Sequence, residues 1–212
     1  MTTLEQFLDD VKHHEITIHQ NNGVYRHLEF KKTNNSNPYF NISTFPDHLV
    51  ITARIDGLSY ALVLSKRYDM FDYFRDYLGD NDLKIYPKLW SEMIRSTSYK
   101  GIIESYSEFD LDKIKRCAQE YLDDFISGNK LSAEDVAALR WEFESNVLNA
   151  EYEHEIIDSI TNFGFCGFNF DEFWEGNYRK YRRNYIWLCY AIVWGIKKFD
   201  ELNQDGKNHD RT

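Results

Sequence analysis

The sequence is poor in cysteine, proline and glycine, and each shortage excludes a class of protein. The three cysteines (Cys117, Cys166 and Cys189) are odd in number and form no CxxC pair, which excludes the disulfide framework of a small secreted domain and favours a reduced, cytosolic compartment. Only three prolines and ten glycines leave little room for flexible linkers. The longest apolar run, Ile186 to Ile196, is shorter than the roughly 20 residues that span a bilayer, so we expect no membrane segment. The first residues, MTTLEQFLDDVKHH, lack the basic and apolar regions of a secretory signal.

What is present is the composition of a soluble globular chain. Hydrophobic residues make up 42% of the sequence and charged residues 28%, which is ordinary for a packed domain. A length of 212 residues suits one domain with its own core. The net charge of −10 disfavours direct binding to nucleic acid or to an anionic membrane, because like charges repel. Composition alone names no activity.

The first 65 residues predict a short helix followed by an antiparallel sheet. Apolar residues from Leu4 to Lys12 fall at helical spacing. In the segments after Lys12 every second residue is apolar, which is the pattern of a strand with one buried face. Turn signals such as Asn21-Asn22-Gly23 and Asp56-Gly57 separate these alternating segments. We therefore expect a meander of about five strands, at residues 15–19, 24–30, 39–45, 48–55 and 58–64.

Residues 66–203 predict helices that pack with the sheet as one domain. Ser65, Asp110 and Ser132 are suited to cap helices, and Pro87 is suited to open one that buries residues up to Ile94. The last helix, at residues 178–202, is apolar nearly all round between residues 186 and 196 and should be the central buried helix. Residues 164–173 read as a connection, and residues 204–212 as a flexible tail. The fold class is therefore α+β, an antiparallel sheet on a helical layer.

The histidines do not form a zinc motif. His14 and His19 flank a glutamate as in a metalloprotease helix, but their spacing is i+5 rather than i+4 and their segment reads as a strand. A hairpin would bring His19 close to His27 on the outward face of the sheet. Without a cysteine pair to add ligands, we expect no metal and no other cofactor.

Catalytic signatures are equally weak, so we assign no catalytic residue. The sequence has no G-x-S-x-G elbow and no phosphate-binding loop. Cys166 lies in a glycine-flanked loop with His154 nearby in sequence, but such cysteines are more often packed as small hydrophobes. The basic, aromatic stretch from Tyr178 to Tyr185 is suited to bind phosphates or bases, or to pair with neighbouring acids, which we favour.

The distribution of charge is the most informative feature. Residues 104–158 contain 15 acids and five Lys or Arg, a difference that equals the net charge of the whole chain. Such a surface is either a solvated helical face or a docking site for a basic protein surface, such as one that normally holds nucleic acid. The candidate contact residues lie off the apolar stripes of the expected helices: Asp112, Asp123, Asp124, Glu134, Glu142 and Glu144.

Two parts of the chain resemble small accessory proteins of tailed phages and prophages. The stretches that carry the resemblance are residues 14–31, 39–49, 69–74, 173–175 and 185–200, which include YRHLEF and YIWLCYAIVWGI. The resemblance implies a phage origin and action in the host cytoplasm, but no reaction. Small acidic phage proteins without catalytic motifs often inhibit host defence, so we expect a non-enzymatic, anti-CRISPR-like inhibitor that binds a host protein. A metal-dependent nuclease or hydrolase and a phage assembly factor remain alternatives, and the oligomeric state stays open.

Overall fold

The structure is a computed structural model that describes residues 2–33, 35–78 and 83–209, without the side chains of residues 35–37 and 205–209. It divides into two compact units. The first, which we call the sheet unit, comprises Met1–Ser107 and Tyr181–Thr212, and the second, the helical unit, comprises Glu108–Lys180. These boundaries differ from the division expected at residue 65, because the last helix returns to the sheet while residues 108–180 build a core of their own.

The α+β fold predicted from the sequence is confirmed. Six antiparallel strands follow one another in chain order across one sheet. The strands are β1 (Glu15–Asn22), β2 (Tyr25–Lys32), β3 (Asn35–Phe45), β4 (His48–Ile55), β5 (Leu58–Ser65) and β6 (Ile94–Thr97). Between β4 and β5, Asp56 and Gly57 both have positive φ, as a two-residue type I′ hairpin turn requires.

The sixth strand corrects one expectation. The helix opened by Pro87, α3 (Pro87–Ser91), ends after five residues, and the chain then pairs with β5. Ile94 is opposite Leu64 in this pairing, so its burial comes from the sheet and not from a helix. A polar run of Ser and Thr after Ile94 has little preference for a helix, which lets the open edge of β5 decide the conformation.

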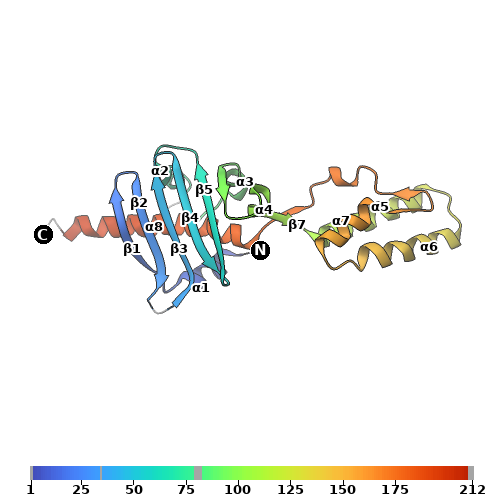
Figure 1. The fold of residues 1–212 in the computed structure, drawn as a ribbon, viewed down its shortest axis with the longest axis horizontal. Helices are drawn as coiled ribbons and strands as arrows, with labels where there is room; N and C mark the ends of the chain where they lie inside the picture. Colours follow the sequence, from blue (N-terminus) through green and yellow to red (C-terminus); the bar gives the residue numbers. More distant parts are fainter. Residues whose placement is uncertain (1, 34, 79–82, 210–212) are drawn as a thin grey trace. The chain divides into compact units, whose positions relative to one another are not determined.

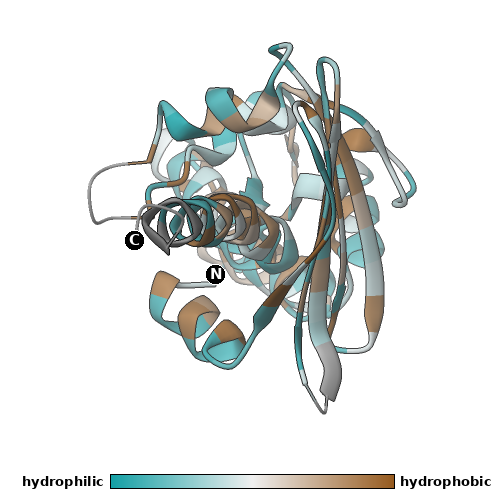
Figure 2. Cartoon of the chain, turned by 90° about the vertical axis from the view of Figure 1, so that its left-hand side faces the viewer, coloured by the Kyte–Doolittle hydropathy of each residue, from teal (hydrophilic) through white to brown (hydrophobic). Residues whose placement is uncertain are grey.

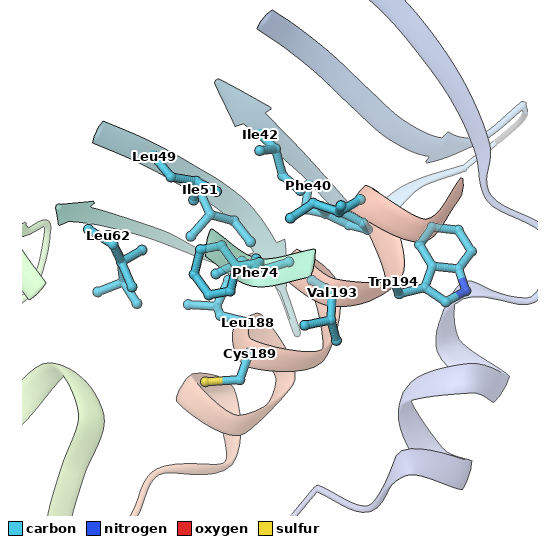
Figure 3. Packing of buried hydrophobic residues seen from close by; sticks show 14 of the residues in the cluster. Phe40, Ile42, Leu49, Ile51, Leu62, Phe74, Leu188, Cys189, Val193 and Trp194 are labelled. Atoms are coloured by element: carbon cyan, nitrogen blue, oxygen red, sulfur yellow. The ribbon is translucent and has the colours of Figure 1, made fainter. Parts of the chain in front are cut away.

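Helices cover one face of the sheet. Figure 2 shows α8 (Arg183–His209) end-on beside the sheet, with α1 (Leu4–Val11) on the same side. Along β3 and β4 every second side chain points to this face, and Phe40, Ile42 and Ile51 are fully buried there. Figure 3 shows the same face from close by, with side chains of α8 packed against those of the strands.

The expectation that residues 186–196 form a buried central helix is confirmed. Trp187, Ile192 and Ile196 are at most 2% exposed. The helix lies so close to the sheet that a Cβ atom on Gly195 would stand 2.8 Å from the Cδ1 atom of Ile42. Trp187 also donates a hydrogen bond from its indole to Asp10, which ties α1 to α8. Figure 1 labels both helices beside the strands of the sheet.

Two helix starts differ from the sequence prediction. The helix expected to begin at Ser65 is α2 (Met70–Arg75), and its cap is Asp69, whose carboxylate accepts the amide of Phe71, because Ser65 is the last residue of β5. Helix α8 begins at Arg183 rather than at residue 178, because β10 (Arg179–Tyr181) pairs with β7 (Ser107–Phe109). The helix continues through residues 204–209, where the sequence predicts a flexible tail, and residues 210–212 lie outside the described part.

The sheet unit contains one further short helix, α4 (Ile102–Tyr106), in the stretch after β6. The helical unit consists of α5 (Leu111–Gly128), α6 (Ala133–Phe143), a π-helical turn η1 (Glu144–Leu148) and α7 (Glu153–Thr161), followed by a small hairpin of β8 (Gly164–Phe165) and β9 (Phe168–Asn169) and a 3₁₀ turn η2 (Phe173–Glu175). As predicted, Asp110 caps α5 and Ser132 caps α6, each accepting a backbone amide in the first turn. The hairpin replaces the expected irregular connection at residues 164–173, since Cys166 and Gly167 both have positive φ.

Candidate functional site

The helical unit carries the whole net charge of the chain. Its 73 residues include 17 Asp and Glu against seven Lys and Arg, a net charge of −10. The rest of the chain has 18 acids and 18 bases and is neutral. The boundary between the units therefore coincides with a boundary between a balanced and an acidic surface, which sequence counting placed at residues 104–158.

Four of the six predicted contact residues are exposed carboxylates. Asp112 and Asp124 lie on α5, Glu134 lies in the first turn of α6, and Glu144 begins the π-helical turn. Within the described part of the chain none of these four side chains makes an ion pair or a hydrogen bond. Their charges are thus fully available to a partner, apart from screening by salt.

The other two predicted contact residues are engaged within the unit. Arg140 of α6 places Nη2 2.8 Å from Oδ1 of Asp123 on α5, an ion contact that links the two helices without a hydrogen bond. Both side chains are about half exposed, so the contact stabilises little. Glu142 accepts a hydrogen bond from the side chain of Asn146, one turn later. Asp123 and Glu142 therefore present less free charge than the four others.

Sequence reasoning missed the most exposed aromatic side chain of the helical unit. Trp141 is 68% exposed on α6, on the opposite side from the buried Leu139 and Phe143. Ala137 and Ala138, one turn earlier, are exposed as well. A signal was present in the sequence: α6 has more apolar residues than its inward stripe can hold, so some had to face outward.

The π-helical turn adds a second feature to this region. The amide of Asn149 donates to the carbonyl of Glu144, five residues earlier, and one extra residue is thereby inserted into the helix. Phe143 and Val147 stay buried on either side of it, while the residues between them, Glu144 to Asn146, are exposed. Such turns occur frequently at functional sites.

The histidine cluster on the sheet is real but small. The rings of His19 and His27 lie 5.0 Å apart on the outward face, as the hairpin predicted. His19 is 3.3 Å from a carboxylate oxygen of Glu29, and Nδ1 of His27 is 2.9 Å from the hydroxyl of Ser43. In residues 2–33, 35–78 and 83–209, no three His, Cys, Asp or Glu side chains are grouped so that they could hold a metal ion.

The other residues considered in the sequence analysis are the basic stretch at residues 178–185, Cys166 and His154. In the basic stretch, Lys180 pairs with Asp110 at 3.5 Å, and Arg183 lies 3.7 Å from Asp56, which agrees with the pairing interpretation. Cys166 is exposed at the hairpin turn, and His154 stacks on Tyr152.

A cavity of about 660 Å³ lies in the sheet unit, between α1, β1 and α8. Its walls include the apolar side chains of Leu8, Ile16 and Trp194. His14 borders it with Nε2 2.8 Å from the carbonyl of Pro38, and burial lowers the pKa of this imidazole. Glu15, Glu201, Lys12 and Lys198 line the same cavity, so the histidine is one of five titratable side chains around it.

Comparisons with known proteins add no family. The chain matches no protein-family model, and comparison with curated proteins and with solved structures gives no significant match. The resemblance to phage and prophage proteins is therefore an expectation that these comparisons leave untested. No helix in the described part of the chain is both long and apolar enough to cross a bilayer.

Proposed function

We propose that the chain is a non-enzymatic interaction protein that binds a basic protein surface through its helical unit. The observation that carries the proposal is the confinement of the entire net charge to 73 residues, with four exposed carboxylates that have no ion-pair partner among the described residues. An uncompensated negative field attracts cationic surfaces, speeds encounter and competes with nucleic acid for the same Lys and Arg side chains.

We further propose that the partner is a host protein and that binding inhibits a host defence system in the manner of an anti-CRISPR protein, in the host cytoplasm. This step is supported by the resemblance to phage accessory proteins and by the electrostatic argument. Effector complexes that bind nucleic acid hold it in positively charged channels, which an acidic helical surface can occupy.

The test is an infection assay in bacteria whose CRISPR system targets an infecting phage. Wild-type protein should restore plaque formation, and a variant with four neutralised carboxylates should not, because the attraction to the effector is lost. The isosteric substitutions in that variant are Asp112→Asn, Asp124→Asn, Glu134→Gln and Glu144→Gln. With a purified effector, the variant should associate about tenfold more slowly at low salt, a difference that disappears at high salt.

A matched control removes the same number of charges from the sheet unit. Four exposed acids there are suitable for the control: Glu5→Gln, Glu15→Gln, Glu92→Gln and Glu104→Gln. The control should retain full activity. Equal loss of activity in the two variants, or full activity of the first, would show that the acidic unit is only a solvated surface.

A further inference from the structure

One face of α6 combines an aromatic centre with charged ends. Five residues on this face follow one another at intervals of three or four positions, so they share one side of the helix. They are Glu134, the adjacent Ala137 and Ala138, Trp141 and Glu144. All five side chains are exposed. The face is thus a tryptophan with small neighbours on one side and a carboxylate at each end.

Trp141 is the exception among the five tryptophans of the chain. Trp90, Trp187 and Trp194 are buried, and Trp174 is partly buried in the core of the helical unit. An indole left in water loses the large hydrophobic gain that burial brings. Exposed tryptophans framed by polar residues are the typical anchors of protein interfaces.

The charges around Trp141 decide which partner fits. The face of an indole ring attracts cations, and the guanidinium group of arginine both stacks on the ring and binds carboxylates through paired hydrogen bonds. Glu144 lies one turn after Trp141, and Glu134 two turns before it, so a chain that carries several cationic side chains can engage both ends. A hydrophobic partner without cations would leave these carboxylates unpaired, and an anionic partner would be repelled.

We propose that this face of α6 binds an arginine-rich segment of a basic protein, with one guanidinium group stacked on Trp141 and others paired with Glu134 and Glu144. The proposal rests on the proposed function, since it takes the helical unit as the binding unit, and it adds the anchor and the preferred cation. Ala137 and Ala138 leave room beside the indole because their side chains are single methyl groups.

The test uses two synthetic peptides, nine arginines and nine lysines, against the full-length protein. Nuclear magnetic resonance resolves the indole N–H signal of each tryptophan, and Trp141→Phe assigns the signal of interest. We expect the Trp141 signal to shift on addition of the arginine peptide while the signals of Trp90 and Trp187 stay in place. The arginine peptide should bind several-fold more tightly than the lysine peptide.

The variant Trp141→Ala should weaken binding of the arginine peptide by about 3- to 30-fold and remove most of the preference for arginine. Folding should be unaffected, because the side chain is exposed. The matched control is Tyr152→Ala, which truncates another exposed aromatic side chain of the same unit, 60% exposed and outside this face. That variant should bind both peptides as the wild type does.

The outcomes separate the two proposals. The assignment of this face is wrong if the two peptides bind equally and the Trp141 signal does not move. It is also wrong if the two peptides bind equally and Trp141→Ala and Tyr152→Ala change binding by the same factor. In either case the acidic unit remains a binding unit. If neither peptide binds even at low salt, the proposed function fails together with the inference.

Discussion

Truncation of Ile192 to alanine should destabilise the sheet unit strongly. The side chain is 2% exposed and belongs to the core of the sheet unit. Figure 3 shows the neighbouring Leu188 and Val193 on the part of α8 that packs against the sheet. The substitution removes three carbon atoms and leaves a cavity that the surrounding side chains fill only in part. Comparable changes in well-packed cores cost about 2–5 kcal/mol, the sum of the lost transfer free energy and a cavity term.

The position of α8 places Ile192→Ala at the upper part of this range. The close approach at Gly195, where a Cβ atom would meet both Ile42 and the ring of Phe30, shows that helix and sheet are already in tight contact nearby. The stacked rings of Phe30 and Phe40, with centroids 4.5 Å apart, resist collapse into a new cavity. A loss of about 3 kcal/mol or more is therefore expected.

The assay is reversible urea denaturation followed by tryptophan fluorescence. Because Trp141 and Trp174 belong to the helical unit, both are replaced by phenylalanine, so that the remaining tryptophans report on the sheet unit. Leu202→Ala on the same helix is the matched control. Its side chain is 46% exposed, and the cost should be below about 1 kcal/mol.

A loss below about 0.5 kcal/mol for Ile192→Ala would refute the reasoning, and so would a loss no larger than that of Leu202→Ala. Either result would mean that α8 is peripheral to the core. A large loss with an unchanged dependence on urea concentration would support the packing argument, because the slope reports the surface exposed on unfolding.

Two further predictions concern charge. Burial by itself would raise the pKa of Asp69, but hydrogen bonds from Arg26 and from the amide of Phe71 outweigh it and hold the pKa below its usual value. The pair therefore stabilises the protein above about pH 4 and loses its effect as the pH falls through the lowered pKa. Asp69→Asn should cost about 3 kcal/mol at pH 7, and the cost, measured by urea midpoints, should shrink as the pH falls through that pKa. The carboxylates of the helical unit repel one another, so its stability should increase as salt rises to roughly 0.2 M, because salt screens the repulsion. Over the same range its binding to a cationic peptide should weaken. If stability and binding change in the same direction, this explanation is wrong.

The elements that the sequence predicts well are those whose signals are local. Asp56 and Gly57 both adopt positive φ, and Ser132 caps α6 through a hydrogen bond only three residues along the chain. The errors arise where distant segments decide. Residues 94–97 become a strand because β5 offers an open edge, and residues 179–181 become one because β7 pairs with them. No local pattern reports the presence of such a partner.

The candidate site shows the same limit. Counting charges located the acidic region from the sequence, and four of its six chosen carboxylates are free in the described part of the chain. Whether Asp123 is paired depends on the placement of α6 beside α5, which brings Arg140 to it. The exposure of Trp141 likewise depends on which side of α6 faces the core, and large aromatic residues are assigned to cores by default.

Neither folding nor helix formation explains why one unit is acidic and the other neutral. Glutamate, lysine and arginine form helices almost equally well, so a mixture of charges on α5 and α6 would cost the helices nothing. The sheet unit, with 18 acids and 18 bases, shows that the same chain balances its charge where no imbalance is needed. In the helical unit, Glu134 and Glu144 add repulsion and gain no ion pair from any residue that the structure describes, and Trp141 between them stays 68% exposed. The cationic partner that we propose would account for both features at once, because it would neutralise the carboxylates and cover the indole in a single contact.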